Sequence, residues 1–340
     1  MTNSSKTLPF PVNVRRSASI LSTGAYLPSR VLTNAELEKM VDTTDEWIFS
    51  RTGIRERRIA EKDETTSDMG AQAASQAIQR AGIDPKSIDL IIVATCTPDN
   101  AFPSTACYVQ HKIGATRAAA YDVGAACSGF LYALVTASQF IATGAYETVL
   151  VVGSEKLSSI VNWQDRNTCV LFGDGAGAVI LQHRPGARGL LAFDLGADGA
   201  QTEILSVPAG GCRMPITPEV LDQRLQFLQM SGKEVFKYAV NAMNRSAEDC
   251  LEKAGCKAGQ LRWVIPHQAN LRIVDAVAQR LNISLEHFIV NLDRYGNTSA
   301  ACMPICLDEA SLAGKLDRGD LLLMVAFGGG LTWASAVLEW

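Results

Sequence analysis

Continuous apolar runs mark the strands that this chain is expected to form. Residues 90–95 and 149–152 lack the alternation of polar and apolar positions that a half-exposed strand shows. Such runs are typical of strands in a sheet that helices cover on both faces. The pattern therefore predicts an α/β fold with buried sheets.

Apolar positions at helical spacing predict the helices that join those strands. Residues 67–81 carry an apolar stripe, and Ser67 is placed to cap that helix. Ser231 and Glu234 have the spacing of a capping box in front of a second amphipathic helix. Residues 128–143 are apolar around most of the circumference of the predicted helix, so we expect this helix to be buried on all sides.

The same order of elements occurs twice along the chain. In each copy an amphipathic helix ends at Ala-Gly, and the two Ala-Gly pairs are 173 positions apart (254 − 81). The matched segments are 81–92 with 254–265, 20–24 with 192–196, and 172–175 with 327–330. Each segment of the last pair is expected to form the corner of a hairpin before a final strand. Three matches in the same order predict a duplicated α/β unit.

The division between the two copies is expected at the polar segment 183–186, which contains Pro-Gly. We therefore expect an N-terminal extension over residues 1–18, a first half over 19–185 that carries the nucleophile, and a second half over 186–340.

Composition narrows the class of protein. Apolar residues make up 47% of the chain and charged residues 19%, which excludes a disordered or collagen-like protein and supplies a large core. The formal net charge of −4 disfavours a nucleic-acid partner, because such partners usually require a basic surplus.

Cysteine usage and the lack of long apolar segments indicate the compartment. The nine cysteines form no CxxC pair and have no histidines at zinc-ligand spacing, so we expect free thiols and no bound metal. The N-terminal residues lack the apolar stretch of a signal peptide, and no apolar stretch is long enough to span a membrane. We therefore expect a cytoplasmic protein without a membrane span.

Cys127 has the sequence setting of a nucleophile. It follows a predicted strand and a turn of small residues, and it precedes the buried helix. That strand–turn–helix order resembles the nucleophile elbow of serine enzymes. The free N–H groups and the positive end of the helix dipole are expected to lower the pKa of the thiol. The alternative is an ordinary core cysteine.

His267, Asn297 and a glycine-rich loop are candidate partners of this thiol. His267 directly follows the predicted strand 263–265, at the end where α/β sheets place their chemistry. Asn297 follows a glycine in a loop before a helix, where an ordinary turn residue is the alternative. The loop 327–330 is either a flexible hairpin corner or a source of backbone N–H groups for an oxyanion.

Two further segments allow a functional interpretation. The basic cluster 51–58 follows Trp47, and it is either a solvated surface or a place where an indole and arginines hold a purine and its phosphates. The glycine-rich segment 173–177 lacks the G-x-G-x-x-G spacing and leads into a strand, so we do not expect a dinucleotide site there.

Six short motifs, spread over almost the whole chain, occur in a recognisable order. They are 45–54, 125–130, 172–178, 266–272, 296–301 and 327–330. In this set and order the chain resembles the β-ketoacyl-acyl-carrier-protein synthase III family of the thiolase superfamily. The resemblance implies a thiolase-like, five-layered αβαβα fold built from two duplicated halves.

The resemblance also implies a reaction, a decarboxylative Claisen condensation. Cys127 would accept the acyl group of a coenzyme A thioester, and His267 and Asn297 would stabilise the enolate formed from malonyl-acyl carrier protein. The N–H groups of Cys127 and Gly329 would form the oxyanion hole. The product would be a β-ketoacyl-acyl carrier protein, which initiates fatty acid synthesis. Coenzyme A enters as part of the substrate, and no resident cofactor is implied.

The same resemblance implies binding residues around the site. Trp47 and Arg166 would sandwich the adenine of coenzyme A, with Arg51 near its phosphates. The other implied residues are Asn270 along the pantetheine, Thr43 in the nearby loop, Phe102 reaching across a homodimer interface, and Arg272, Lys237 and Arg280 as the docking patch for the acidic carrier protein.

Related condensing enzymes fit the sequence less well. A thiolase needs a second cysteine near 327–330, and an elongating synthase has histidine in place of Asn297. A chalcone-synthase-like enzyme has a proline in the C-terminal loop, and a 3-hydroxy-3-methylglutaryl synthase needs a catalytic glutamate that the sequence does not place. A synthase III-like enzyme of secondary metabolism with an unusual acyl or aryl starter stays open, as does, more remotely, a non-catalytic acyl-binding protein.

One departure from the family pattern lies close to the candidate site. Cys302 and Met303 stand where the family commonly has serine and a branched aliphatic residue. We therefore expect the packing behind Asn297 to differ.

Overall fold

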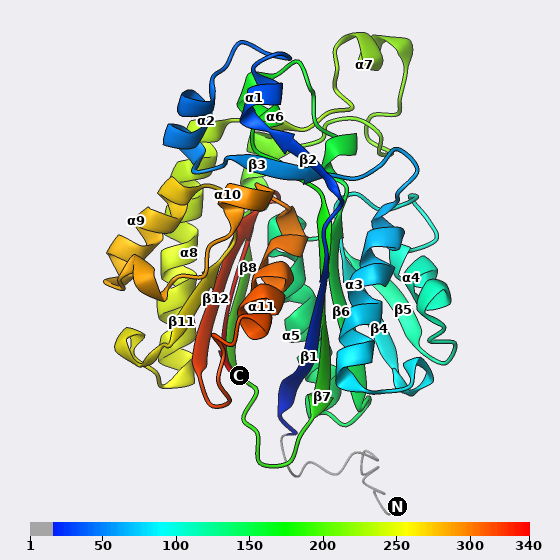
Figure 1. Ribbon diagram of the computed structural model, residues 1–340, viewed down its shortest axis with the longest axis vertical. Coiled ribbons are helices and arrows are strands. Elements are labelled where there is room, and N and C mark those ends of the chain that lie inside the picture. Colours follow the sequence, from blue (N-terminus) through cyan, green and yellow to red (C-terminus); the bar gives the residue numbers. More distant parts are fainter. Residues whose placement is uncertain (1–15) are drawn as a thin grey trace, which may run out of the picture.

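The computed structural model describes residues 16–340, which form two similar sheets with helices between and outside them (Figure 1). The expected N-terminal extension, 1–18, lies almost entirely outside the described residues. The chain passes from the first sheet to the second through residues 184–189, at the lower end of Figure 1.

The first sheet has five strands in the order β1-β7-β6-β4-β5. They are β1 (Ala18–Tyr26), β4 (Leu90–Ala94), β5 (Ala119–Val123), β6 (Thr148–Glu155) and β7 (Gly175–His183). β4 pairs in parallel with β5 and β6, whereas β7 pairs antiparallel with β6 and β1. β4 and β6 are buried along their whole length, as their apolar runs predict.

The second sheet has four strands in the order β11-β12-β13-β8. They are β8 (Leu190–Ala197), β11 (Trp263–Pro266), β12 (Leu321–Gly328) and β13 (Thr332–Glu339). β11 pairs in parallel with β12, and β13 pairs antiparallel with β12 and β8. Strand for strand this repeats the first sheet without its edge strand β5, so the duplication inferred from the sequence is present in the fold.

Helices form three layers around the two sheets. The main helices are α3 (Thr66–Ala81), α4 (Thr105–Ile113), α5 (Gly129–Ala142), α8 (Gly232–Ala254), α9 (Leu271–Leu281) and α11 (Cys302–Leu312). α3 and α4 cover the outer face of the first sheet, and α8 and α9 cover that of the second (Figure 1). α5 and α11 lie between the sheets and share one apolar core with strands of both. The layers therefore follow the expected αβαβα order.

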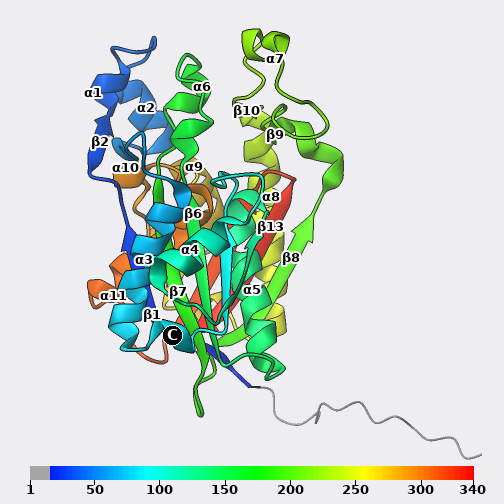
Figure 2. The same ribbon diagram turned by 90° about the vertical axis from the view of Figure 1, so that its right-hand side faces the viewer.

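Shorter elements cover one end of the sheets, the upper end in Figures 1 and 2. They are β2 (Arg30–Thr33), α1 (Asn34–Leu37), α2 (Asp45–Thr52), β3 (Glu56–Ile59), α6 (Arg166–Cys169), β9 (Leu205–Ser206), α7 (Pro218–Asp222), β10 (Gln229–Met230) and α10 (Leu292–Tyr295). β2 pairs with β3, and β9 pairs with β10. The C-terminus lies at the opposite end of the molecule (Figure 1).

Three local predictions are wrong. α3 begins before Ser67, because Thr65 forms a capping box with the residue three positions on. Ser231 is the N-cap of α8, but its side chain makes no capping hydrogen bond. The corner expected at 172–175 ends a long connection that contains α6, whereas 327–330 forms a tight hairpin turn.

Equivalent turns of the two halves meet between the sheets. Ala126 and Ser299, 173 positions apart (299 − 126), each begin a 3₁₀ turn with a positive φ, of 45° and 48°. A Cβ on Gly153 of β6 would lie 2.3 Å from a carbonyl oxygen of the second turn. A Cβ on Gly328 of β12 would lie 2.7 Å from the backbone nitrogen of Cys127 in the first turn. Glycine at these positions therefore lets each turn pack against a strand end.

Candidate active site

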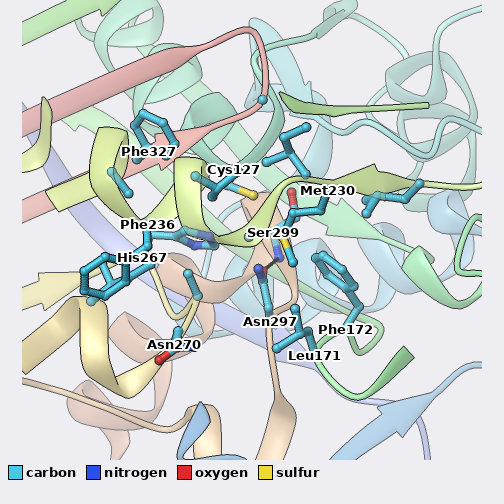
Figure 3. Close-up of a pocket in the computed structure, with 18 of the residues that line it drawn as sticks. Cys127, Leu171, Phe172, Met230, Phe236, His267, Asn270, Asn297, Ser299 and Phe327 are labelled. Carbon is cyan, nitrogen blue, oxygen red and sulfur yellow. Dashed lines mark hydrogen bonds between the residues drawn. The ribbon is translucent and has the colours of Figure 1, made fainter. Parts of the chain in front are cut away.

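A cavity of about 760 Å³ opens where the two turns meet. Cys127, His267 and Asn297 all line it, and they come from the turn before α5, the segment after β11 and the turn before α11. Figure 3 shows the three side chains pointing toward the same space. The structure thus brings together the three residues that the resemblance assigns to catalysis.

Cys127 is a buried thiol in the tight turn between β5 and α5. Burial raises the pKa of this thiol to about 12, and hydrogen bonding to Ser299 and to the Cys127 backbone opposes the shift only in part. The prediction of a lowered pKa is therefore wrong, because loss of water outweighs the helix N-terminus. The raised pKa therefore favours the neutral thiol over the thiolate at neutral pH.

His267 is held at the end of β11 by its backbone N–H, which donates to the Val325 carbonyl oxygen at 2.8 Å. The residue is 2% exposed, and burial lowers the pKa of the imidazole to about 3. The ring is therefore neutral at physiological pH and carries one proton. Its Nδ1 lies 3.1 Å from the Sγ of Cys302, which leaves Nε2 for the cavity.

Asn297 has a defined amide orientation. Its Oδ1 accepts a hydrogen bond from the Ser299 backbone N–H at 2.8 Å, and its own backbone N–H donates to the Leu171 carbonyl oxygen at 2.8 Å. Because a backbone N–H can only donate, the atom facing it is the amide oxygen. The Nδ2 group is thereby left as a donor toward the cavity.

The glycine-rich loop borders the same cavity. Gly329 lines it, and Gly328 approaches the backbone of Cys127. The loop is therefore a hairpin corner and also a wall of the site. The oxyanion-hole assignment of the Cys127 and Gly329 N–H groups stays a prediction, because it concerns a bound intermediate.

Trp47 and two arginines form one side of the entrance. The guanidinium carbon of Arg51 lies 4.8 Å from the Trp47 ring centre, and that of Arg166 lies 5.1 Å away. Trp47 and Arg51 line the cavity, whereas Arg166 donates to the Asp42 carbonyl oxygen at 2.7 Å. A ring between two stacking partners needs about 7 Å, twice an ordinary contact distance. Arg166 must therefore move outward for an adenine to lie between it and Trp47.

The other implied substrate residues are placed differently. Asn270 lines the cavity, and its Oδ1 caps α9 by accepting from the Arg272 backbone N–H at 2.8 Å. Thr43 is half-buried and does not line the cavity. Phe102 is 86% exposed in the loop before α4, and it does not line this chain's own cavity.

The expected carrier-protein residues lie on adjoining surfaces of α8 and α9. Arg272 lines the cavity and donates to the Ser50 carbonyl oxygen at 3.2 Å. Arg280 lies two turns further along α9 and donates to the Asn241 Oδ1 of α8 at 2.9 Å. Lys237 is exposed one turn before Asn241 on α8. The expected docking patch therefore extends from Arg272 at the cavity to Arg280 and Lys237 on the outer surface of α9 and α8.

The structure adds residues that the sequence analysis missed. Lys233 lines the cavity one turn before Lys237, a spacing that the helical pattern already contained. Cys96 also lines the cavity, next to the fully buried Glu155, whose pKa burial raises. Glu155 accepts from the Thr97 hydroxyl at 2.7 Å and from the Cys96 backbone N–H at 3.0 Å. These hydrogen bonds fix the segment that carries Cys96, which forms part of the cavity wall.

Three general features accompany the site. All nine cysteines are unpaired. Within residues 16–340, no helix is long and apolar enough to cross a membrane. The same part of the chain contains no group of three or more His, Cys, Asp or Glu side chains placed to hold a metal ion.

A cysteine, a histidine and an asparagine at the junction of two duplicated α/β halves define a condensing enzyme of thiolase-like fold. Solved structures confirm the fold class. The 3-oxoacyl-[acyl-carrier-protein] synthase III of Aquifex aeolicus is 50% identical with a TM-score of 0.89, over 95% of this chain and 100% of that chain. The priming β-ketosynthase from the R1128 polyketide biosynthetic pathway is 37% identical with a TM-score of 0.90, over 98% of both chains.

Sequence comparisons give the family. The family models "3-Oxoacyl-[acyl-carrier-protein (ACP)] synthase III" and its C-terminal counterpart match residues 121–199 and 251–340. The β-ketoacyl-[acyl-carrier-protein] synthase III of Desulfitobacterium hafniense is 53% identical over 95% of this chain and 98% of its own length. That of Roseiflexus castenholzii is 54% identical over the same shares. The chain therefore belongs to the 3-oxoacyl-[acyl-carrier-protein] synthase III family.

Proposed function

We propose that the protein condenses an acyl-coenzyme A starter with malonyl-acyl carrier protein to give a β-ketoacyl-acyl carrier protein, the step that initiates fatty acid synthesis. The observation that carries this proposal is the convergence of Cys127, His267 and Asn297 on one cavity. The names of the similar proteins support the same reaction.

The first half-reaction is acyl transfer to Cys127. The sulfur attacks the thioester carbonyl carbon, the carbon–sulfur bond to coenzyme A breaks, and the thiol proton passes to the departing coenzyme A sulfur. The N–H groups of Cys127 and Gly329, two residues that line the cavity, would hold the intermediate oxyanion. Because one thioester replaces another, this step needs no metal or redox cofactor.

The second half-reaction is decarboxylation and carbon–carbon bond formation. Loss of CO₂ from the malonyl group leaves its electron pair in an enolate, whose oxygen accepts hydrogen bonds from His267 Nε2 and Asn297 Nδ2. The enolate carbon attacks the acyl carbonyl, and the bond to the Cys127 sulfur breaks. The released thiolate then regains a proton. A neutral imidazole suits this role, because a donor is required without a permanent charge.

The assembly and compartment are parts of the same proposal. The exposed Phe102 is an apolar side chain suited to an interface, which supports a homodimer in which it closes the acyl site of a second copy. The unpaired cysteines suit a reducing compartment, which supports a cytoplasmic location. Arg272, Lys237 and Arg280 supply local positive charge for an acidic carrier protein, although the net charge of the chain is −4.

A second candidate differs only in the starter. One similar structure, at 37% identity, is a priming β-ketosynthase from a polyketide pathway. The same machinery in this chain then accepts an unusual acyl or aryl group. The retention of all three reacting side chains argues against the non-catalytic acyl-binding alternative.

Intact-mass spectrometry with a panel of acyl-coenzyme A thioesters tests both candidates. Straight, branched and aromatic starters are each incubated with the enzyme, and malonyl-acyl carrier protein is then added to the acyl-enzyme. We expect a mass increase that maps to the Cys127 peptide, followed by its loss as the β-ketoacyl product forms. Cys127→Ala should prevent the increase. Acylation at Cys96, Cys107 or Cys169, or an acyl-enzyme that never condenses, would contradict the proposed function.

A further inference from the structure

Within residues 16–340, the inner ring nitrogen of His267, Nδ1, has one side-chain hydrogen-bonding partner, which is Cys302. Its Sγ lies 3.1 Å from Nδ1, and both residues are buried. The sulfur also lies 3.5 Å from the backbone nitrogen of Gln268, whose N–H donates to it. Cys302 is the first residue of α11, so the helix that follows Asn297 carries this contact.

The direction of the contact follows from the chemistry of the groups. Burial raises the pKa of the Cys302 thiol and lowers that of His267, so the thiol keeps its proton and the ring is neutral. The backbone N–H of Gln268 can only donate, and it uses a lone pair of the sulfur. The neighbouring backbone N–H groups of Cys302 and Met303 can likewise only donate to this sulfur, so its S–H is free to point at Nδ1.

We infer that Cys302 is a positioning residue: its S–H donates to Nδ1 of His267 and so keeps the single imidazole proton on Nε2, the nitrogen that faces the cavity. The opposite arrangement, with the proton on Nδ1, adds a ring N–H to the backbone N–H donors around the sulfur and leaves the thiol proton without Nδ1 as its acceptor. It also turns a bare lone pair of Nε2 toward the substrate, where a donor is needed.

This inference deepens the proposed function and rests on it in one respect. The enolate of the condensation needs the Nε2–H, whereas acyl transfer to Cys127 does not. Cys302 therefore serves the second half-reaction, and it does so without touching the reacting atoms. Its tautomer effect exists whether or not malonyl-acyl carrier protein is the true donor.

Three variants separate positioning from packing. Cys302→Ala removes the donor, and Cys302→Ser replaces S–H with O–H. Cys306→Ala is the matched control, because Cys306 is equally buried one turn later on α11 and donates to Asn291 Oδ1 instead, at 3.2 Å. We expect Cys302→Ala to slow condensation by about 10- to 100-fold, less than the loss of a whole oxyanion donor. Acylation by acyl-coenzyme A should change little, and Cys302→Ser and Cys306→Ala should keep most of the condensation rate.

Nitrogen-15 NMR of histidine-labelled protein reports which ring nitrogen of His267 is protonated, a property that a purely structural role of Cys302 would leave unchanged. The chain has four histidines, so the His267 resonances can be assigned with a His267→Asn variant. We expect protonated Nε2 and unprotonated Nδ1 in the wild type and in Cys302→Ser, and a mixture or the reverse in Cys302→Ala. Protonated Nδ1 in the wild type, or an unchanged tautomer and condensation rate in Cys302→Ala, would overturn the inference. A wild type with the expected tautomer but no condensation would contradict the proposed function alone.

Discussion

Replacement of Asn297 separates the two half-reactions most sharply. The amide contributes two different contacts: Oδ1 accepts the Ser299 N–H at 2.8 Å, and Nδ2 is left for the enolate. Asn297→Ala removes both, whereas Asn297→Asp keeps an oxygen for Ser299 and replaces the donor with a carboxylate. A loss of condensation that both variants share is then due to the missing donor and not to the missing acceptor of the Ser299 N–H.

The expected magnitudes follow from these contacts. Loss of one oxyanion donor costs about 2.7–4 kcal/mol of transition-state stabilisation, so condensation should fall by about 10²- to 10³-fold in Asn297→Ala and by at least as much in Asn297→Asp, whose carboxylate also repels the enolate. Asn297→Ala also leaves the buried Ser299 N–H without its acceptor, which should lower the free energy of unfolding by about 1–3 kcal/mol. Asn297→Asp keeps the acceptor for this N–H, but burial of its carboxylate has a desolvation cost of its own.

Three measurements test this reasoning on each variant. Intact mass after addition of acyl-coenzyme A reports acylation, release of CO₂ from malonyl-acyl carrier protein reports condensation, and urea unfolding reports stability. Acylation should stay close to wild type in both variants. The division of labour is refuted if acylation falls as far as condensation does, or if Asn297→Asp condenses at the wild-type rate.

Three further predictions address pH, docking and assembly. Because burial lowers the pKa of His267 to about 3, the unfolded chain binds a proton between about pH 6.5 and pH 3 that the folded chain does not. As the pH is lowered through this range, the free energy of unfolding should decrease by about 1.4 kcal/mol per pH unit from this group. Urea unfolding of His267→Gln should show a smaller decrease over the same range. Arg280→Glu, outside the cavity, should slow only the carrier-dependent condensation and make its rate less sensitive to salt. Arg272→Glu, at the cavity wall, should slow acylation as well. Equal condensation rates in the wild type and both variants would exclude this docking surface. Phe102→Asp should shift sedimentation from a dimer toward a monomer, and a wild-type monomer would contradict the proposed assembly.

Much of the fold could be predicted from local patterns. Fully buried strands such as β4 and β6 appear in the sequence as apolar runs, and the repeat of Ala-Gly stops at 81–82 and 254–255 reveals the duplication. Both signals depend only on neighbours within a few residues, which is why sequence reasoning captures them. Helix caps such as Thr65 were missed, because several hydroxyl residues in one segment compete for the same role.

For the candidate site, too, the sequence predicts some features and the tertiary structure decides others. The turn before α5, the strand end before His267 and the loop containing Asn297 are visible as motifs, so the sequence alone names the candidate reacting residues. The protonation and the orientation of these side chains cannot be predicted from the sequence alone. The pKa of Cys127 is raised by burial among segments distant in the chain, which overrides the local helix end that pointed the other way. The contact of Cys302 with His267 and the stacking of Arg166 on Trp47 likewise join residues far apart in sequence.

The sequence by itself therefore determined the main elements, their duplication, and which side chains are candidates for the chemistry. Only the tertiary structure decided which of those side chains carry protons, which way each amide and imidazole faces, and how the entrance is built. The physical reason is the distance along the chain over which each effect acts. Hydrophobic periodicity and turn chemistry depend on residues close in sequence. Desolvation and hydrogen-bond partners depend on all the segments that folding brings around a group, however distant they are in sequence.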